Sequence, residues 1–409
     1  MIKRPDAARI TQPGRGFIRV GEDVVFQEFQ SFWSGAAYEV RESPADGTGE
    51  EANPICLVAM DGARTRIVEE PLTAKPDRDE LSAVRDYLRE VARENGIQKL
   101  PGPWLEDLPE RLSLEGLLEG KSVTFDGSAW PEEGLPWMKV PIGMYDSPEN
   151  QSQGILYLDL PKQGHTAIYG APGTGKTTML KSIVWSLCQC FSPGEAVVYI
   201  LDCGGWSMKV LEDLPHVGGV ALDFEEEKIK KTAPLILDEI ESRKRKFLEQ
   251  GVSSISAYRE TGTESMPAIL LAVDNVTALT ETYPEMERLL VTVAGQGASY
   301  GIYLICTAAS PGGIRFRIAA NIKNAISFEL AEKGDYVNAV GRLLGKSLPP
   351  VRGRGFIRGN PPLEFQAALP FLEDTEAKQT ARIRTVAKTM AESWRGRGQG
   401  HWPRRIPVM

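Results

Sequence analysis

The residues best suited to chemistry lie in the stretch HTAIYGAPGTGKTTMLKSIVWSLC, at positions 165–188. This stretch contains the pattern Gly-x-x-x-x-Gly-Lys-Thr in full, between an apolar run and an amphipathic one. Glycines allow successive backbone N–H groups to point at phosphate oxygens, and a helix that follows adds the partial positive charge of its N-terminus. The lysine can reach the outer phosphates, and the threonine hydroxyl can bind Mg²⁺. The stretch predicts a loop that holds the phosphates of a nucleoside triphosphate.

The predicted phosphate-binding residues form one continuous run. They are Gly170, Ala171, Pro172, Gly173, Thr174, Gly175, Lys176, Thr177 and Thr178. Within this run Lys176 is also the candidate catalytic cation, and Thr177 is a candidate magnesium ligand. A chance glycine-rich turn is the alternative, but the full motif between a strand and a helix favours the phosphate loop.

A magnesium site also requires a carboxylate close to the phosphate loop. Two apolar runs end in aspartate: AVVYILD ends at Asp202, and AILLAVD ends at Asp274. Both runs are typical of buried strands, and the carboxyl ends of parallel strands meet at the sheet edge where ligands bind. The pattern alone leaves the choice between the two aspartates open.

Apolar strands alternating with longer helices must position these residues. The expected strands span 155–158, 166–169, 196–201, 268–273, 302–306 and 325–330, and the expected helices span 176–190, 225–250 and 284–296. Continuous apolar strands separated by helices are typical of a parallel sheet covered on both faces. The sequence therefore predicts an α/β fold with a mostly parallel sheet flanked by helices.

Composition limits the classes of partner. The chain has 409 residues, of which 42% are hydrophobic, and a formal net charge of −8. This charge disfavours the broad basic face that non-specific nucleic-acid binding needs, so we expect no nucleic-acid partner. The five cysteines lack paired spacing and the three histidines are scattered, so we expect buried thiols rather than a metal cluster. No window holds the eighteen apolar residues of a membrane span, and the stretch MIKRPDAARI lacks the apolar core of a signal peptide.

A family resemblance rests on motifs that follow the phosphate loop in order: VVYILDCGG, AILLAVDN, GIYLICTAAS, GRGFIRGN and EFQAALP. With them the whole chain resembles the FtsK/SpoIIIE-type ATPase modules of the EccC/EssC proteins, the membrane-anchored coupling ATPases of type VII secretion. The resemblance implies a RecA-like P-loop NTPase core of the ASCE class, with ATP and Mg²⁺ as cofactors. It also implies that Asp274 holds the Walker B position and binds Mg²⁺ together with Thr177.

Departures from the family pattern concern hydrolysis. Asn275 stands where active FtsK-type motors have a catalytic glutamate, and an amide cannot accept a proton as a carboxylate does. A sensor position reads Thr307-Ala308, and the segment 321–325 lacks the arginine that motors offer to a neighbour. We therefore expect ATP binding with weak or no hydrolysis in isolation, and a role in regulation, docking and substrate export. The alternative is an active ATP-hydrolysing translocation motor completed by oligomerisation.

A repeated phrase organises the chain: Gly-Arg-Gly-Phe-Ile-Arg begins at Gly14 and again at Gly353, each time with Glu-Phe-Gln downstream. The resemblance implies that residues 1–40 are the tail of a preceding ATPase module and 41–135 an inter-module linker. This linker should contain a hairpin that turns at Asp61-Gly62 and a helix that ends near Gly96. Residues 136–372 would be the ATPase domain, and 373–409 a C-terminal helix and the start of the next linker. The resemblance thus implies that the chain is the central, second module of the tandem.

The resemblance also implies partners and a location. Expected partners are the neighbouring ATPase modules with their linkers, secreted substrates of the WXG100 type, and the membrane components of type VII secretion. The expected location is the cytoplasmic part of a membrane-anchored protein. We further expect WLEDLPERLSLEGLL, at 104–118, to pack on the preceding module, and the stretch beyond Arg405 to pack on this one. Trp206 and Met208 fit either core packing or an apolar pocket, and SRKRKF at 242–247 fits a solvated helix face.

Overall fold

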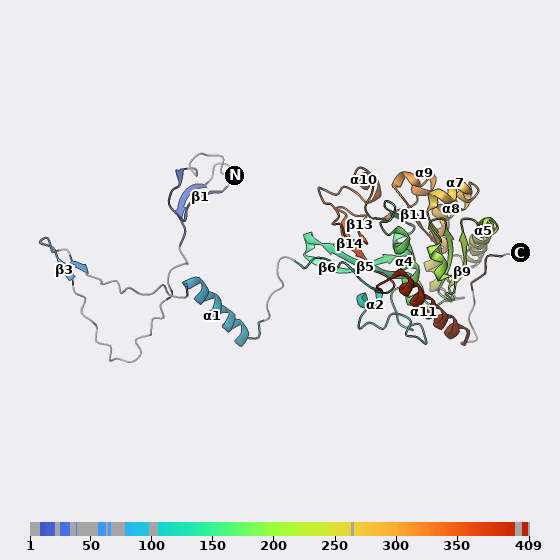
Figure 1. Ribbon diagram of the computed structural model, residues 1–409, viewed down its shortest axis with the longest axis horizontal. Helices are drawn as coiled ribbons and strands as arrows, with labels where there is room; N and C mark the ends of the chain where they lie inside the picture. Colours follow the sequence, from blue (N-terminus) through green and yellow to red (C-terminus); the bar gives the residue numbers. More distant parts are fainter. Residues whose placement is uncertain are drawn as a thin grey trace. The chain divides into compact units, whose positions relative to one another are not determined.

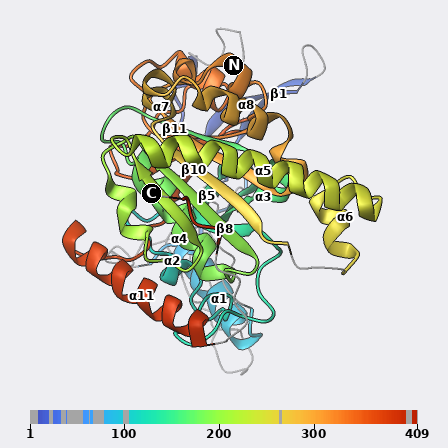
Figure 2. The ribbon, with the colours of Figure 1, turned by 90° about the vertical axis from the view of Figure 1, so that its right-hand side faces the viewer.

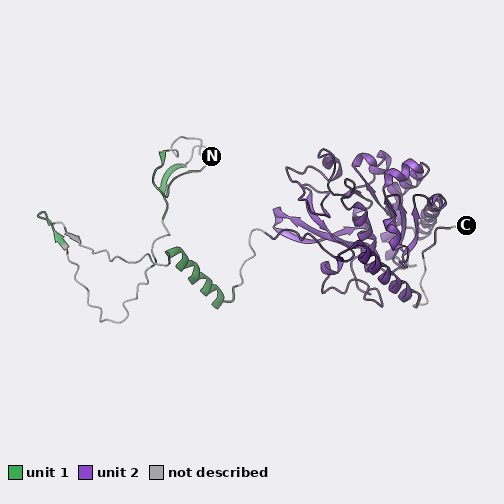
Figure 3. Cartoon of the chain, in the orientation of Figure 1, with its two compact units in different colours: residues 1–101 green, residues 102–409 purple. Residues whose placement is uncertain are grey.

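The computed structural model describes residues 9–20, 25–32, 38, 56–62, 64–66, 78–97, 105–262, 266–396 and 403–407. These residues belong to two compact units, Met1–Pro101 and Gly102–Met409, which Figure 3 distinguishes by colour. Each unit is described by itself. None of the described helices is long and apolar enough to cross a membrane.

The first unit contains two hairpins and one helix. Their bounds are β1 Arg15–Val20, β2 Val25–Gln30, β3 Cys56–Val58, β4 Arg64–Arg66 and α1 Glu80–Glu94. The turn between β3 and β4 contains Asp61 and Gly62, as predicted, and Gly62 adopts a positive φ of 83°. Asp79 caps α1 by accepting the backbone N–H of Ser82 at 2.7 Å, and Gly96 follows the helix with a φ of 65°. The predicted hairpin and helix are therefore confirmed.

The second unit is built on a ten-stranded sheet with the order β6-β5-β14-β13-β12-β7-β11-β10-β8-β9. The strands are β5 Lys139–Ser147, β6 Ser152–Asp159, β7 Thr166–Tyr169, β8 Ala196–Asp202, β9 Val217–Leu222, β10 Ala268–Asp274, β11 Ile302–Ala308, β12 Asn324–Ser327, β13 Arg354–Ile357 and β14 Leu363–Ala367. The six strands from β12 to β9 are parallel, and the other four pair antiparallel. The expected α/β fold with a mostly parallel sheet is confirmed for this core.

Helices cover both faces of the sheet (Figure 1). They are α2 Leu114–Leu117, α3 Leu160–Gln163, α4 Lys176–Cys190, α5 Glu226–Gln250, α6 Ile255–Glu260, α7 Val276–Thr282, α8 Met286–Gln296, α9 Phe316–Ala319, α10 Asp335–Ala339 and α11 Glu376–Gly396. On one face α4 and α11 pack in one core, and on the other α5, α7 and α8 pack in a second, as Figure 2 allows the reader to follow. The long helices begin and end within two residues of the positions predicted for them.

Side-chain alternation along the central strands builds these two cores. In β8, Val198 and Ile200 belong to the core beneath α4, whereas Val197 and Tyr199 belong to the core beneath α5. Successive side chains of a strand point to opposite faces, so a strand buried on both faces must be apolar throughout. This is why the central strands were recognisable from continuous apolar runs. Strand β9 was not predicted, because Gly218 and Gly219 interrupt its apolar pattern.

The repeated phrase folds into the same hairpin in both units. β1 pairs with β2 and β13 pairs with β14, antiparallel in each case. In each copy the arginine pairs with the glutamate of Glu-Phe-Gln, at 3.4 Å between Arg15 and Glu28 and at 2.9 Å between Arg354 and Glu364. In each copy the glutamine amide donates to the carbonyl that precedes the first glycine, at 3.1 and 3.0 Å. Identical side chains in the same strand register thus make equivalent contacts, although the first hairpin is three residues longer.

The prediction for 104–118 is wrong for its described part, 105–118. This segment packs on the ATPase unit that follows it: Leu114 is buried in the core beneath α4, and its N–H donates to the Leu369 carbonyl at 3.0 Å. Buried Arg354 donates to the Leu108 carbonyl at 2.9 Å. The apolar residues of the segment are stabilised by burial, and they are buried against α4 and the end of β14 in the same unit.

The solvated-face prediction for 242–247 is also wrong at two positions, Arg243 and Phe247, which are buried. Arg243 is only 1% exposed, and its guanidinium donates to the carbonyls of Tyr300 and Pro267 at 2.7 and 2.8 Å. It also pairs with Glu239 at 2.8 Å, one turn earlier on α5. A buried arginine is tolerated when its donors are satisfied in this way. The charge pattern of the helix does not indicate that Arg243 is buried, because its partners Tyr300 and Pro267 lie outside α5.

Candidate nucleotide site

The predicted phosphate loop lies between β7 and α4, at the carboxyl edge of the parallel strands. Gly173 and Gly175 have positive φ values of 79° and 107°, which side chains rarely adopt. A Cβ built on either glycine meets no atom within 4 Å, so both border open space. Gly170 is different, because its Cβ would lie 2.5 Å from the Thr174 hydroxyl and 3.0 Å from Phe328. The loop therefore has an open inner side and a tightly packed base.

Lys176 is the first residue of α4, and its ammonium donates to the Ala171 carbonyl at 2.9 Å, across the loop. The Thr174 hydroxyl donates to the same carbonyl at 2.8 Å. Burial lowers the pKa of Lys176, and the nearby charge of Asp274 acts in the opposite direction. The loop thus holds a partly desolvated cation where the motif predicts contact with phosphates.

Asp274 ends β10 and faces this loop. Its carboxylate accepts the Thr177 hydroxyl at 2.8 Å and the Thr307 hydroxyl at 2.7 Å. Burial raises the pKa of the Asp274 carboxyl, against the lowering effect of these two hydrogen bonds and of Lys176. Carboxylate and hydroxyl oxygens are the ligands that Mg²⁺ prefers, and a divalent cation would stabilise the charged form of a buried carboxylate. The residues present therefore fit a magnesium ion.

Asp202 ends the neighbouring strand β8 in register with Asp274, but its carboxylate is engaged elsewhere. It accepts the N–H groups of Gly204, Trp206 and Met208 at 3.1, 3.2 and 2.9 Å, and so holds the loop that leads into the short 3₁₀ helix η3, Ser207–Leu211. The sequence pattern left open which of the two aspartates faces the phosphate loop, and the order of the strands answers this question. Only Asp274 contacts a side chain of the predicted phosphate loop.

In the segment held by Asp202, Met208 of η3 is fully buried, as core packing predicts, whereas Trp206 is about half exposed. The Trp206 indole donates to Asp223 at 2.7 Å and meets Phe224 edge to face. The alternative of an apolar pocket made by both residues therefore does not describe their arrangement, since they lie in different environments.

Asn275 follows Asp274 with a left-handed φ of 58°. Its side-chain oxygen accepts the Ala278 N–H at 3.3 Å and caps α7, and its amide donates to the Cys203 carbonyl at 3.2 Å. Its own N–H donates to the Thr307 hydroxyl at 2.8 Å. Asparagine is among the residues that favour both an N-cap and a left-handed backbone. Both polar atoms of the side chain are thus committed to backbone groups.

A cavity of about 620 Å³ adjoins the outer side of the loop at Gly173, Thr174 and Gly175. Thr178 and Ser182, one helical turn apart on α4, lie at its wall. Sequence reasoning extended the site to Thr178 and missed Ser182, although the spacing of four places it on the same helix face. It also missed the segment 110–112, which lines the same cavity and lies about 60 positions before the loop.

The segment 403–407 lies against the edge strand β9. The Ile406 N–H donates to the Gly218 carbonyl at 3.1 Å, and the Tyr199 hydroxyl donates to the Arg404 carbonyl at 2.7 Å. A Cβ on Gly219 would lie 2.7 Å from the Ile406 side chain, so glycine is what allows this close approach. The predicted packing of this stretch on the unit is confirmed for its described residues.

Comparison with known proteins identifies relatives. A family model, FtsK/SpoIIIE family, matches residues 133–355. The chain is 30% identical to the type VII secretion system protein EssC of Staphylococcus aureus over 417 residues, which cover all of this chain and 27% of that protein. The chain therefore spans about a quarter of the length of the curated relatives it matches.

Two solved structures resemble the chain over 75% of its length. One is EssC (ATPases 2 and 3) from Geobacillus thermodenitrificans, at 28% identity and a TM-score of 0.63, with 55% of that chain covered. The other is Thermomonospora curvata EccC (ATPases 2 and 3) in complex with a signal sequence peptide, at 27% identity and a TM-score of 0.65, with 56% covered. Since the family match extends over more than half of the residues and the phosphate loop lies within it, the chain belongs to the FtsK/SpoIIIE family.

Proposed function

We propose that this chain is an ATP- and Mg²⁺-binding module of a type VII secretion coupling ATPase that regulates and docks rather than hydrolyses efficiently. Support for binding comes from the phosphate loop 170–178, with Lys176 for the outer phosphates. Thr177 and Asp274 would hold Mg²⁺. The Thr177 hydroxyl oxygen and an Asp274 carboxylate oxygen lie 2.8 Å apart, so both could bind one ion. Bound Mg²⁺ would neutralise phosphate charge and orient the triphosphate.

The observation that carries the regulatory role is the arrangement of Asn275. Catalysis of hydrolysis by motors of this class requires a carboxylate that polarises the attacking water. Here an amide stands after Asp274, and its oxygen and nitrogen cap α7 and bind the Cys203 carbonyl. The position is therefore used to hold the carboxyl edge together. Nucleotide binding without fast turnover is the function that such a site supports best.

The proposed organisation follows the repeated hairpin. We assign 1–40 to the tail of a preceding ATPase module, 41–135 to a linker, 136–372 to the ATPase domain, and 373–409 to a C-terminal helix and the next linker. The equivalent contacts of Arg15 with Glu28 and of Arg354 with Glu364 support the first assignment. The relatives whose structures contain ATPases 2 and 3 support a central place in a tandem.

Neighbouring modules and their linkers are the proposed partners. The packing of 403–407 on β9, through a backbone hydrogen bond and buried Ile406, supports docking of a linker segment on this unit. A relative bound to a signal sequence peptide supports secreted substrates, for instance of the WXG100 type, as further partners of the whole protein. Membrane components of type VII secretion would then be partners too, with this module on the cytoplasmic side.

The test is calorimetric titration of Mg-ATP into the chain, with phosphate release followed on the same samples. Lys176→Ala should weaken affinity roughly ten- to a hundredfold, because charge-assisted bonds to phosphate are lost. Asp274→Asn should remove the dependence of affinity on Mg²⁺, and Lys388→Ala, exposed on α11, should change nothing. Turnover of about 1 s⁻¹ or more by the isolated chain would refute the regulatory proposal and favour the motor.

A further inference from the structure

The cavity beside the phosphate loop has a wall that comes from outside the P-loop core. Thr178 and Ser182 of α4 line one side, and Leu369 lines another. Residues 110–112 of the upstream segment also line the cavity, as does Asp374, just before α11. At about 620 Å³ the cavity lies within the usual range for small-molecule sites. Its position, continuous with the loop that would hold phosphates, suits the remaining part of a nucleotide, its base and ribose.

One buried polar group points to a ligand in this cavity. The Ser182 side chain is 1% exposed, and its hydroxyl has no hydrogen-bond partner among the described residues. A buried hydroxyl without a partner costs free energy that a hydrogen bond from a ligand can recover. Apolar Leu112, Met179 and Phe328 form much of the remaining lining, which suits the faces of a base.

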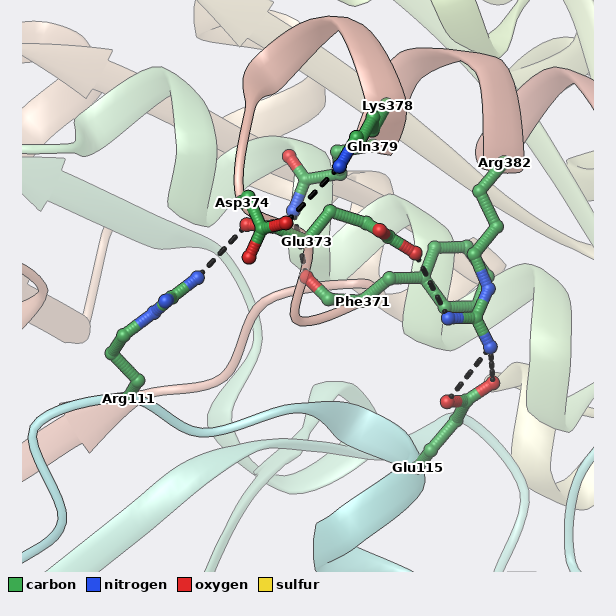
Figure 4. Close-up of polar contacts among 8 residues, drawn as sticks. All are labelled: Arg111, Glu115, Phe371, Glu373, Asp374, Lys378, Gln379 and Arg382. Atoms are coloured by element: carbon green, nitrogen blue, oxygen red, sulfur yellow. Dashed lines mark hydrogen bonds and ion pairs between the residues drawn. The ribbon is translucent and has the colours of Figure 1, made fainter.

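The upstream wall is held by an ion-pair clasp, which we define as Glu115, Glu373 and Arg382 (Figure 4). The Arg382 guanidinium pairs with Glu115 at 3.0 Å and with Glu373 at 3.1 Å, and it lies 4.1 Å from the centroid of the Phe371 ring. Arg111, whose side chain lines the cavity, donates to the Glu373 carbonyl at 2.9 Å. The clasp thus joins the segment before the core to the helix after it, and its Glu373 is followed in the chain by Asp374, which lines the cavity.

The backbone adds a second connection between the same elements. The Leu369 N–H donates to the Leu112 carbonyl at 2.8 Å, and the Leu114 N–H donates to the Leu369 carbonyl at 3.0 Å. Residues 112–114 therefore extend the end of β14 like a short added strand. Any movement of this segment would break these bonds and open the cavity on one side.

We propose that residues 110–112 close the nucleoside end of the nucleotide site, so that nucleotide binding and docking of the upstream segment stabilise each other. This inference rests on the proposed function, because it assigns the phosphates to the loop 170–178. Coupling is reciprocal: whatever nucleotide binding adds to the closed segment, the closed segment adds to nucleotide affinity. Arg382 of the clasp belongs to α11, which follows the core. In this proposal the segment before the core and the helix after it are therefore both coupled to the bound nucleotide.

The experiment compares two probes, Mg-ATP and Mg-tripolyphosphate, by calorimetry on the whole chain. The first would fill the loop and the cavity, and the second only the loop. Arg382→Ala and Glu115→Gln should each weaken Mg-ATP binding about three- to tenfold, as expected for partly exposed ion pairs in a network, and leave Mg-tripolyphosphate unchanged. The exchanged pair, Arg382→Glu with Glu115→Arg, should recover part of the loss. Arg384→Ala, exposed on the same helix, is the matched control.

Hydrogen exchange gives an independent readout. Mg-ATP should slow exchange in the peptides that contain Leu114 and Leu369, and Mg-tripolyphosphate should not. Equal losses for both probes, or no loss in any clasp variant together with unchanged exchange, would show that the clasp is structural only and would overturn this inference. If neither probe binds in a Lys176-dependent way, the proposed function itself fails. Binding of tripolyphosphate therefore separates the two failures.

Discussion

Replacement of Asn275 by glutamate tests whether the site lacks only a carboxylate. In the structure Asn275 caps α7 and has a φ of 58°. Loss of an N-cap costs about 1 kcal/mol, and a glutamate held in the left-handed region costs about 1 kcal/mol more. Because the new carboxylate would also lie beside Asp274, these terms give a lower estimate. We therefore expect Asn275→Glu to lose about 2 kcal/mol of unfolding free energy and about 4 °C in Tm, without gaining turnover.

The assay is calorimetric unfolding of the three variants Asn275→Glu, Asn275→Ala and Asn275→Gly, with phosphate release measured in parallel. Glycine keeps the left-handed backbone without strain, and replacing a cap by glycine costs only a few tenths of a kcal/mol. Alanine loses the cap and keeps the strain, so it should resemble glutamate. The order of Tm should be wild type, glycine, alanine, with glutamate at or below alanine because its carboxylate lies beside Asp274. A glutamate variant as stable as the wild type that turns over at about 1 s⁻¹ would refute this account of the position.

Two further predictions concern stability and docking. Burial lowers the pKa of His165 and of His216 to about 4, so the folded unit resists protonation that the unfolded chain accepts below its usual histidine pKa of 6.5. The unfolding free energy should therefore be highest above pH 6.5 and fall as the pH drops toward 4, by on the order of 3 kcal/mol for each histidine. Urea unfolding at a series of pH values measures this fall. His216→Gln should make the fall less steep, and an unchanged slope in this variant would contradict the prediction. Ile406→Asp should release the segment 403–407 from β9 and speed tryptic cleavage after Arg405 about tenfold or more, since the burial of Ile406 is lost. Leu248→Asp, at an exposed position of α5, is its control, and equal cleavage rates in the two variants would exclude docking through Ile406.

Features that depend on neighbours in the sequence were predictable. The phosphate loop was recognisable because each of its residues acts through its own backbone or side chain within one turn. The central strands and α4 were recognisable because burial on both faces demands continuous apolar runs. The hairpin at Asp61-Gly62 and the cap at Asp79 follow from local turn and capping preferences in the same way.

Features that depend on strand order were not. Asp202 and Asp274 end similar strands, and only the insertion of β11 between β7 and β10 places one of them against Thr177. Nor does the sequence show that Asn275 caps a helix while Thr307 from another strand binds its N–H. The contacts of Asp274 with Thr177 and of Asn275 with Thr307 join residues more than 30 positions apart, whereas the cap on Ala278 is local.

The sequence by itself thus predicted a phosphate loop, a carboxylate nearby, and an amide at the position where active FtsK-type motors have a catalytic carboxylate. Only the tertiary structure showed the contact of Asp274 with Thr177, the place of Ser182 at a cavity beside the loop, and the lining of that cavity by residues 110–112. The physical reason is that motifs and periodicity report on a residue's own backbone and burial. The partners of Asp274, Arg382 or Ile406 are chosen by packing between distant segments, which local patterns do not encode.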